Sequence, residues 1–339
     1  MIRHSQGGVT MRAVRLQAVG RIELVKVTDP LPGPGEVLVR VLAAGICGTD
    51  RHLYKGEFPC APPVTLGHEF AGDVVACGEG VTLPPGTRIA CDPNIACGAC
   101  DQCLRGRTNL CLRNVAIGIH RDGGFADMAV IPAHRAVTVA DLDPHHAAFA
   151  EPLACTLHGL DLGAPVPGER VIVLGGGVIG LLAVQLARNA GAEVTLVTRH
   201  PAKRALALTV GATHTAATEA EARALLPQGA DLVLECAGVA ETVEMAPRLT
   251  RSGGRVVILG VMPQGQKVGI EPFDLLFREI RLLHSFINPF TQTRAAAMLM
   301  AGQVQVAPLI SRIIPLSKAP EVIANPATPG EVKVLVVPG

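Results

Sequence analysis

Residues 171–180 read Val-Ile-Val-Leu-Gly-Gly-Gly-Val-Ile-Gly, an apolar run that passes into a glycine-rich segment and then into a helix-like stretch. The apolar run predicts a short buried strand, and residues 181–190 have the apolar composition of a packed helix. Between them, the pattern Gly-x-Gly-x-x-Gly allows a tight turn, close approach of a pyrophosphate to the backbone, and close packing of the helix on the strand. The amino terminus of the helix would attract the phosphates. The predicted cofactor contacts in this stretch are Gly175, Gly177, Val178, Ile179 and Gly180.

The pattern of a strand followed by a helix-length segment continues on the carboxyl side of this stretch. Further apolar runs occupy residues 193–197, 231–236, 255–259 and 282–287. Apolar strands at this spacing are typical of a parallel sheet that helices cover on both faces. A lone Gly-x-Gly-x-x-Gly is a weak signal, but at the start of such a series it indicates a Rossmann fold. We therefore predict a doubly wound α/β cofactor domain over residues 160–290.

The sequence before residue 160 has a different pattern, in which short β-like runs alternate with glycine and proline. These runs occupy residues 11–16, 37–43, 70–76 and 129–132. They predict a domain rich in strands and loops. A helix-like stretch at 291–301 and the short runs that end at 332–337 are too short to form a domain of their own. We therefore expect the first domain to span residues 11–159 and 291–339.

The composition indicates a globular chain of about two domains and excludes several classes of partner. The 339 residues are 49% hydrophobic and 17% charged, which is enough for a sizeable core. Thirty basic and 29 acidic residues leave a net charge of +1, without the basic footprint of a nucleic-acid-binding protein. No apolar stretch reaches the ~18 residues of a membrane span, and the polar residues 1–10 do not resemble a secretory signal. We predict a cytoplasmic protein in which residues 1–10 are a tail or precede the true start.

Four of the ten cysteines fall within one short segment. They are Cys97, Cys100, Cys103 and Cys111. The first three are spaced to deliver their sulfurs to one ion from a tight turn, and the fourth follows after a seven-residue loop. Because protein would fill all four positions, we predict a structural zinc ion. A reducing cytosol disfavours two disulfides, while four free thiols and an iron–sulfur cluster remain as alternatives.

A second set of metal-ligand residue types is dispersed over the first domain. Cys47 opens the segment Cys-Gly-Thr-Asp, and His68 and Glu69 follow Gly67. A thiolate, an imidazole and a carboxylate make a three-ligand zinc site with one open position, as in catalytic zinc sites. Glu151, in the segment Ala-Glu-Pro-Leu, is a further candidate carboxylate. Taken singly, Cys47 would be a buried small side chain and His68 a satisfied polar group, so the prediction depends on their combination.

These motifs, in this order from Met11 onward, resemble those of the zinc-dependent medium-chain alcohol dehydrogenases. The similarity is greatest to the polyol (sorbitol-type) and threonine dehydrogenases, because a glutamate follows the ligand histidine. The resemblance implies a GroES-like β-barrel catalytic domain and a Rossmann cofactor domain, associated as a homodimer or a homotetramer. It also implies a catalytic zinc ion bound by Cys47, His68 and Glu69, with water or Glu151 completing the shell.

The resemblance further implies a route by which a proton leaves the site. The hydroxyl of Thr49, two residues after Cys47, would relay the proton, and His52 would pass it to solvent through the nicotinamide ribose. Zinc lowers the pKa of an alcohol, so that the adjacent carbon can release a hydride to the nicotinamide. Without the resemblance to this family, His52 could equally be a surface histidine with no role in proton transfer.

The residues after the second strand of the cofactor domain bear on the choice of cofactor. NAD enzymes commonly place Asp or Glu about 20 residues beyond the glycine pattern to bind the ribose 2′-hydroxyl. Here the residue nineteen positions after Gly180 is Arg199, a cation that can bind a 2′-phosphate through charge-assisted hydrogen bonds. Thr198 can add a hydroxyl, and Lys203 or Arg204 can add a second cation. We therefore predict NADP over NAD, with a solvated Arg199 and relaxed specificity as the alternative.

Together these features predict a zinc-dependent oxidoreductase that transfers a hydride between a secondary alcohol of a polyol or sugar-like molecule and NADP, with two zinc ions per chain. An aromatic content of only 3% favours a polar alcohol or ketone over a bulky aromatic substrate. An NAD-linked threonine-type dehydrogenase is the first alternative, although no partners for an amino-acid substrate are evident. A non-catalytic nucleotide-binding protein is the second alternative. The presence of the candidate catalytic residues argues against it, namely Cys47, Thr49, His68 and Glu69.

Overall fold

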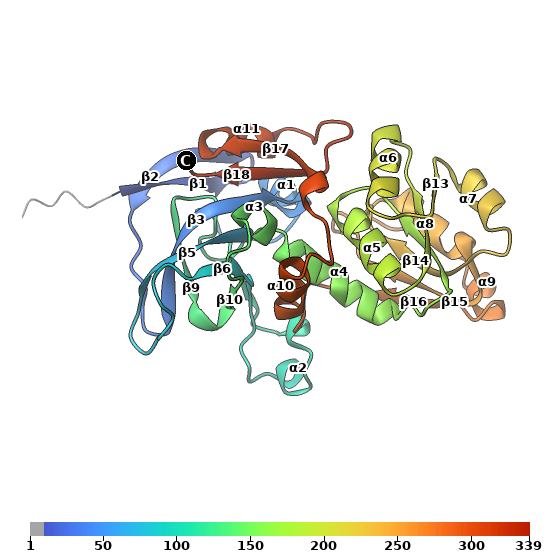
Figure 1. The fold of residues 1–339 in the computed structure, drawn as a ribbon, viewed down its shortest axis with the longest axis horizontal. Coiled ribbons are helices and arrows are strands. Elements are labelled where there is room, and N and C mark those ends of the chain that lie inside the picture. Colours follow the sequence, from blue (N-terminus) through green and yellow to red (C-terminus); the bar gives the residue numbers. More distant parts are fainter. Residues whose placement is uncertain (1–9) are drawn as a thin grey trace, which may run out of the picture.

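The computed structural model describes residues 10–339, so the tail predicted for residues 1–10 lies outside them except for Thr10. The chain forms a strand-rich half and a half built on a parallel sheet, with the helices α4 (Ala150–Gly163) and α10 (Gln292–Met300) between them (Figure 1). No helix in the described part of the chain combines the length and the apolar character that crossing a bilayer requires.

The parallel sheet has six strands in the spatial order β13-β12-β11-β14-β15-β16. Their bounds are β11 (Arg170–Leu174), β12 (Glu193–Val197), β13 (His214–Ala216), β14 (Ala230–Glu235), β15 (Thr250–Ile258) and β16 (Arg281–His284). Every neighbouring pair is parallel. The strand order reverses between β11 and β14, and such sheets bind ligands outside the carboxyl ends of the strands at that point. The predicted Rossmann fold is confirmed.

Helices cover both faces of this sheet, which explains the apolar runs in its central strands β11, β12 and β14. Val171 and Val173 of β11 pack in one core with α5 (Val178–Asn189). Ile172 and Leu174 point the other way, into a second core with α8 (Ala240–Leu249). A strand buried on both faces is expected to be apolar on both, as β11 is from Val171 to Leu174. The other helices of this half are α6 (Pro201–Thr209), α7 (Glu219–Leu225) and α9 (Pro272–Phe277).

The strand-rich half contains a seven-stranded and a three-stranded sheet. The larger sheet has the order β10-β6-β5-β3-β18-β17, with β9 also paired to β3, and the smaller has the order β2-β1-β4. The bounds are β1 (Thr10–Ala18), β2 (Arg21–Thr28), β3 (Glu36–Ile46), β4 (Val64–Thr65), β5 (Glu69–Cys77), β6 (Arg88–Cys91), β9 (Met128–Pro132), β10 (Ala136–Thr138), β17 (Ile310–Pro315) and β18 (Lys333–Val337). The pairs are antiparallel except β17 with β18. Because β18 pairs with β3, the last strand of the chain lies in the same sheet as a strand from its first fifty residues.

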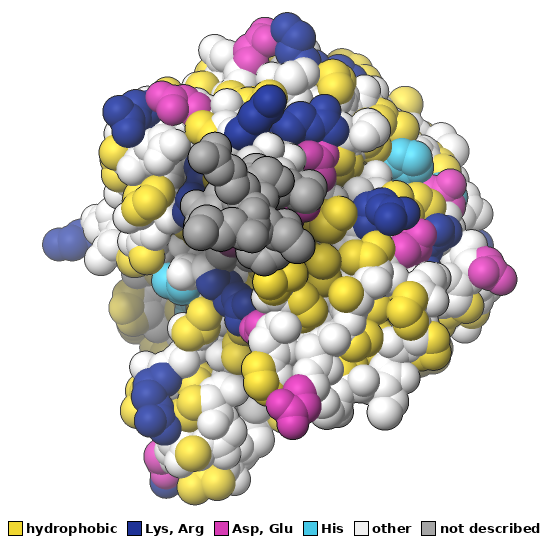
Figure 2. All heavy atoms as spheres, turned by 90° about the vertical axis from the view of Figure 1, so that its left-hand side faces the viewer, with side chains coloured by type: hydrophobic (Ala, Val, Ile, Leu, Met, Phe, Trp, Pro, Cys, Tyr) yellow, Lys and Arg dark blue, Asp and Glu magenta, His cyan; other side chains and the backbone are white. Residues whose placement is uncertain are grey.

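Short elements complete the strand-rich half. They are α1 (Gly48–Lys55), α2 (Asp101–Leu104), α3 (Pro144–Ala147), α11 (Ala319–Ala324), β7 (Asn94–Ile95), β8 (Val115–Ala116) and 3-10 turns at Thr108–Leu110, Ala133–Arg135, Ala307–Leu309 and Leu316–Lys318. α2 belongs to a lobe that projects from the body of the molecule (Figure 1). The face at the barrel end shows basic and acidic side chains interspersed with apolar ones (Figure 2), in keeping with the net charge of +1.

Candidate metal centres and cofactor crevice

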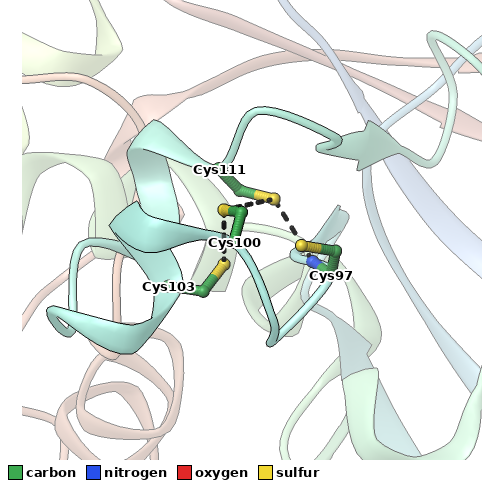
Figure 3. Close-up of side chains that lie close together, drawn as sticks. All are labelled: Cys97, Cys100, Cys103 and Cys111. Carbon is green, nitrogen blue, oxygen red and sulfur yellow. Dashed lines mark hydrogen bonds between the residues drawn. The ribbon is translucent and has the colours of Figure 1, made fainter.

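The four clustered cysteines converge in the projecting lobe. Cys100 Sγ lies 3.5 Å from Cys103 Sγ and 3.9 Å from Cys111 Sγ, and the backbone N–H of Cys97 donates to Cys111 Sγ at 3.3 Å (Figure 3). A tetrahedral zinc ion with Zn–S bonds of about 2.3 Å separates its sulfurs by roughly 3.8 Å. All ten cysteines are free thiols, so the disulfide alternative finds no support here. The donor set therefore fits a four-thiolate zinc site.

The backbone of the lobe favours ionised sulfur at two of these positions. The N–H of Ala99 is the main cause that lowers the pKa of Cys97 to about 6, and the N–H of Cys103 lowers that of Cys100. Desolvation is the main cause that raises the pKa of Cys103 to about 12. The Arg113 guanidinium lies 3.5 Å from Cys97 Sγ and offsets part of the negative charge. The surroundings thus favour thiolates at Cys97 and Cys100, whereas Cys103 would need the positive charge of a bound ion to ionise.

Three dispersed residues form a second cluster of metal-ligand types. One donor atom each from Cys47, His68 and Glu69 lies within 4.8 Å of the others. Cys47 follows β3 directly, while His68 precedes β5 and Glu69 begins it. β3 and β5 pair antiparallel with Gly45 opposite Glu69, so the end of one strand meets the start of the other. The sheet register therefore brings together a thiol, an imidazole and a carboxylate that are far apart in sequence.

Asp50 supports this cluster from helix α1. Its Oδ2 accepts the backbone N–H of Cys47 at 2.8 Å, and its Oδ1 lies 3.8 Å from His68 Nδ1. Burial is the main cause that raises the pKa of Asp50. Burial alone would lower the pKa of His68, but the Cys47 sulfur and Asp50 raise it well above its ordinary value. Among the described residues, neither Asp50 Oδ1 nor His68 Nδ1 has a hydrogen-bond partner. A carboxylate beside a ligand imidazole is the usual outer support of a zinc site, so the donors fit zinc.

Lys333, which no motif singled out, binds the carboxylate of this cluster. Its Nζ lies 2.5 Å from Glu69 Oε2 and donates to the Ile46 carbonyl at 3.2 Å. Lys333 is 2% exposed and Glu69 is 1% exposed. The available signal was a lysine within the apolar run 332–337, where a buried charge requires a partner. Lys333 thus holds one oxygen of Glu69 while the carboxylate remains within the cluster of metal-ligand types.

Glu151 lies near the cluster but is not one of its three mutually close donors. It is buried in the first turn of α4, and burial is the main cause that raises its pKa to about 7. His68 and Glu69 are near enough to influence this pKa. The Cys155 thiol donates to Glu151 Oε1 at 3.3 Å. The structure therefore places Glu151 beside the three ligand types rather than among them.

The two residues predicted to move a proton both lie on α1. Thr49 Oγ1 and Cys47 Sγ are 3.6 Å apart. His52 follows one turn later, and its Nδ1 lies 2.6 Å from Glu57 Oε2, a contact that the sequence analysis missed. The helix therefore extends from the metal-ligand cluster to a histidine–carboxylate pair.

The glycine-rich loop lies at the carboxyl end of β11, as the sequence predicts. Gly175 follows the strand, Gly177 is the residue before α5, and Val178 and Ile179 are half-buried in the first turn of α5. A Cβ atom on Gly180 would lie 1.9 Å from the carbonyl oxygen of Gly175, so only glycine allows this close approach. The loop and the helix amino terminus form a cradle for phosphates.

The corner after β12 is cationic. Thr198 directly follows the strand, and the next residue, Arg199, is exposed. Neither of these two residues is acidic. Arg204 Nη1 donates to the Thr198 carbonyl at 2.8 Å, which braces the corner rather than presenting a free cation. The Lys203 stem lies against the glycine loop, since a Cβ on Gly176 would be 2.9 Å from Lys203 Cβ, and burial lowers the pKa of Lys203. Arg199 and Lys203 are therefore the cations best placed for a phosphate.

Comparisons with known proteins agree with this architecture. Residues 33–141 match the family described as alcohol dehydrogenase GroES-like domain, and residues 178–302 match the family described as zinc-binding dehydrogenase. D-altritol 5-dehydrogenase of Agrobacterium fabrum is 33% identical over 332 residues, which are 96% of this chain and 98% of that protein. L-threonine 3-dehydrogenase of Thermococcus kodakarensis is 32% identical over 305 residues, which are 85% of this chain and 86% of that protein.

A solved structure is similar over almost the whole chain. It is a protein of Sinorhizobium meliloti 1021, assigned as a zinc-binding dehydrogenase and bound to NADP. It is 57% identical, with a TM-score of 0.95 over 97% of this chain and 100% of its own. The family matches and the identities agree with the resemblance of the motifs. This chain belongs to the zinc-dependent medium-chain alcohol dehydrogenases, a family of NAD(P)-linked oxidoreductases, in the branch of the polyol and threonine dehydrogenases.

Proposed function

We propose that this enzyme transfers a hydride between a secondary alcohol of a polyol or sugar-like molecule and NADP. The buried cluster of Cys47, His68 and Glu69 carries the proposal, because it unites the three ligand types of a catalytic zinc site. The similarity to D-altritol 5-dehydrogenase supports a polyol substrate. A panel of polyols and sugars, followed by NADPH absorbance, tests the proposal. Activity confined to substrates outside this class would contradict it.

In this proposal each chain holds two zinc ions. Cys47, His68 and Glu69 would hold the catalytic ion, which would supply the Lewis acidity that lowers the pKa of the alcohol, and water or Glu151 would complete the shell. The four cysteines of the lobe hold the structural ion. Residues 11–159 with 291–339 form the catalytic domain, and residues 160–290 form the cofactor domain.

Thr49 and His52 carry the proton in this proposal. The Thr49 hydroxyl, 3.6 Å from the Cys47 sulfur, is placed to take the hydroxyl proton of the alcohol. His52 lies one turn further along α1 and is partly exposed, so it can exchange protons with solvent.

Replacing Arg199 by Asp is expected to reverse the cofactor preference. Arg199 offers charge-assisted hydrogen bonds to a 2′-phosphate, whereas Asp would repel it and bind a ribose 2′-hydroxyl. Such bonds contribute about 1.5–3 kcal/mol, so the ratio of kcat/KM for NADP over NAD should fall by roughly 10- to 100-fold. Arg223→Asp, at an exposed arginine on α7, is the control and should leave the ratio unchanged. A wild-type preference for NAD, or an unchanged ratio in Arg199→Asp, would contradict the assignment.

The second candidate is an NAD-linked threonine-type dehydrogenase, and the relatives named L-threonine 3-dehydrogenase support L-threonine as its substrate. The cationic corner after β12 speaks against NAD as the preferred cofactor. Comparison of kcat/KM for L-threonine with that for the polyol panel separates the two candidates.

The association into a homodimer or a homotetramer and the cytoplasmic location remain predictions. We expect two copies of the chain to associate through α9 and the neighbouring edge strand β16. Phe273, Leu276 and Phe277 on α9 are 64%, 72% and 71% exposed. An apolar patch beside an open sheet edge is typical of an interface between copies. Leu276→Asp should shift the protein towards monomer in size-exclusion chromatography with light scattering, whereas Leu31→Asp, at an exposed leucine of the other half, should not. An unchanged mass in Leu276→Asp would exclude this surface.

A further inference from the structure

His52 faces a carboxylate that the proposed proton route does not use. Its Nδ1 lies 2.6 Å from Glu57 Oε2, so the ring donates its Nδ1 proton to that oxygen. A histidine that donates from Nδ1 keeps a lone pair on Nε2 and can accept a proton there. The Glu57 side chain is 34% exposed, so the carboxylate also reaches water.

The end of helix α1 places Glu57 beside His52. Gly56 has φ 74°, the left-handed conformation that favours glycine, and its N–H donates to the Leu53 carbonyl at 3.1 Å. The N–H of Glu57 donates to the His52 carbonyl at 2.8 Å, which completes a Schellman-type cap. A Cβ on Gly56 would also lie 2.9 Å from Val19 Cγ1. The cap therefore returns the chain over the last turn and fixes the histidine–carboxylate pair through the backbone.

We propose that Glu57 is the positioning residue of His52 and the group that takes the proton from it to solvent. This inference rests on the proposed role of His52. Glu57 selects the tautomer in which Nε2 accepts the proton that originates on the alcohol. The imidazolium then releases its Nδ1 proton to the Glu57 carboxylate, which gives it to water. One proton moves from the alcohol to solvent, and the two electrons leave with the hydride.

Variants at Glu57 and His52 test the inference in the zinc-loaded enzyme. Glu57→Leu removes the acceptor and should lower kcat by roughly 10- to 100-fold, while KM and the Kd for NADPH stay within twofold. Glu57→Gln can accept the Nδ1 proton in a hydrogen bond but cannot take it up, so its kcat should lie between those of Glu57→Leu and the wild type. NADPH fluorescence measures the Kd with little background, because the chain has no Trp and one Tyr.

Two readouts separate this role from a structural one. The solvent deuterium isotope effect on kcat should rise in Glu57→Leu, and added imidazole should restore part of its kcat by replacing the lost base. The matched control is Glu193→Leu, which removes the carboxylate of an exposed pair with His214 at 3.0 Å and should change neither readout. A fall in kcat without an isotope effect or rescue would overturn the inference.

A double variant distinguishes failure of this inference from failure of the proposed function. In the His52→Gln background, Glu57→Leu should have no further effect, because Glu57 acts through His52. An equal loss of kcat in both backgrounds would overturn the inference and leave the role of His52 intact. An unchanged kcat in His52→Gln alone would contradict the proposed proton route, and the inference with it.

Discussion

Replacing Lys333 by Met is expected to cost about 3–5 kcal/mol of stability in the metal-free protein, because it leaves the buried Glu69 carboxylate without its cation. The pair is almost completely buried, and although burial opposes the charge on Lys333, Glu69 and the Cys47 sulfur raise its pKa above the ordinary value. The melting temperature measured by calorimetry after chelation should fall by roughly 5 °C.

Zinc should compensate for much of this loss. Since the ion supplies the positive charge that Lys333 otherwise provides, added zinc should raise the melting temperature more in Lys333→Met than in the wild type. Lys333→Arg keeps the charge and is the control. Equal melting temperatures of Lys333→Met and the wild type after chelation would show that the pair does not stabilise the fold.

Five of the six strands of the cofactor half could be predicted, because each of them contains an apolar run between helix-length segments. The predicted apolar run that begins at Val171 lies within β11, and the predicted run 193–197 agrees with the bounds of β12. β13 was missed because it has only three residues, of which His214 and Thr215 are only partly buried. So short and polar a strand forms no apolar run and is defined only by pairing with β12.

In the strand-rich half the strands could be recognised, but their partners could not. The contact of Lys333 with Glu69 depends on two registers at once, since β18 pairs Leu335 with Gly45, and β3 pairs Gly45 with Glu69. Neither pairing has a local signal in the sequence. Glu57 is the opposite case, because it lies only five residues after His52 in the sequence. Its contact with His52 could still not be predicted, because it depends on the geometry of the helix cap at Gly56. Motif spacing thus indicates the ligand types, whereas their supporting residues depend on the fold.

Replacing Cys47 by Ser is expected to remove one zinc ion and nearly all activity while leaving the lobe intact. Cys47 is the only sulfur of the three-donor cluster, and the lobe has four cysteines of its own. The zinc content measured by metal analysis should fall from two ions to one per chain. Loss of the Lewis acid removes several kcal/mol of charge stabilisation, so kcat/KM should fall by on the order of 10³ or more.

The converse variant shows why the two metal sites should separate in experiment. Cys103→Ser should also lose one ion, but from the lobe, so the catalytic cluster keeps its donors and the main effect should be a lower melting temperature. Cys60→Ser makes the same chemical change outside both clusters and should retain both ions and full activity. Two ions in Cys47→Ser, with kcat/KM within tenfold of the wild type, would mean that the cluster at β3 and β5 is not the catalytic zinc site. Because the donors of each site are close only to one another, each ion should depend on its own cluster alone.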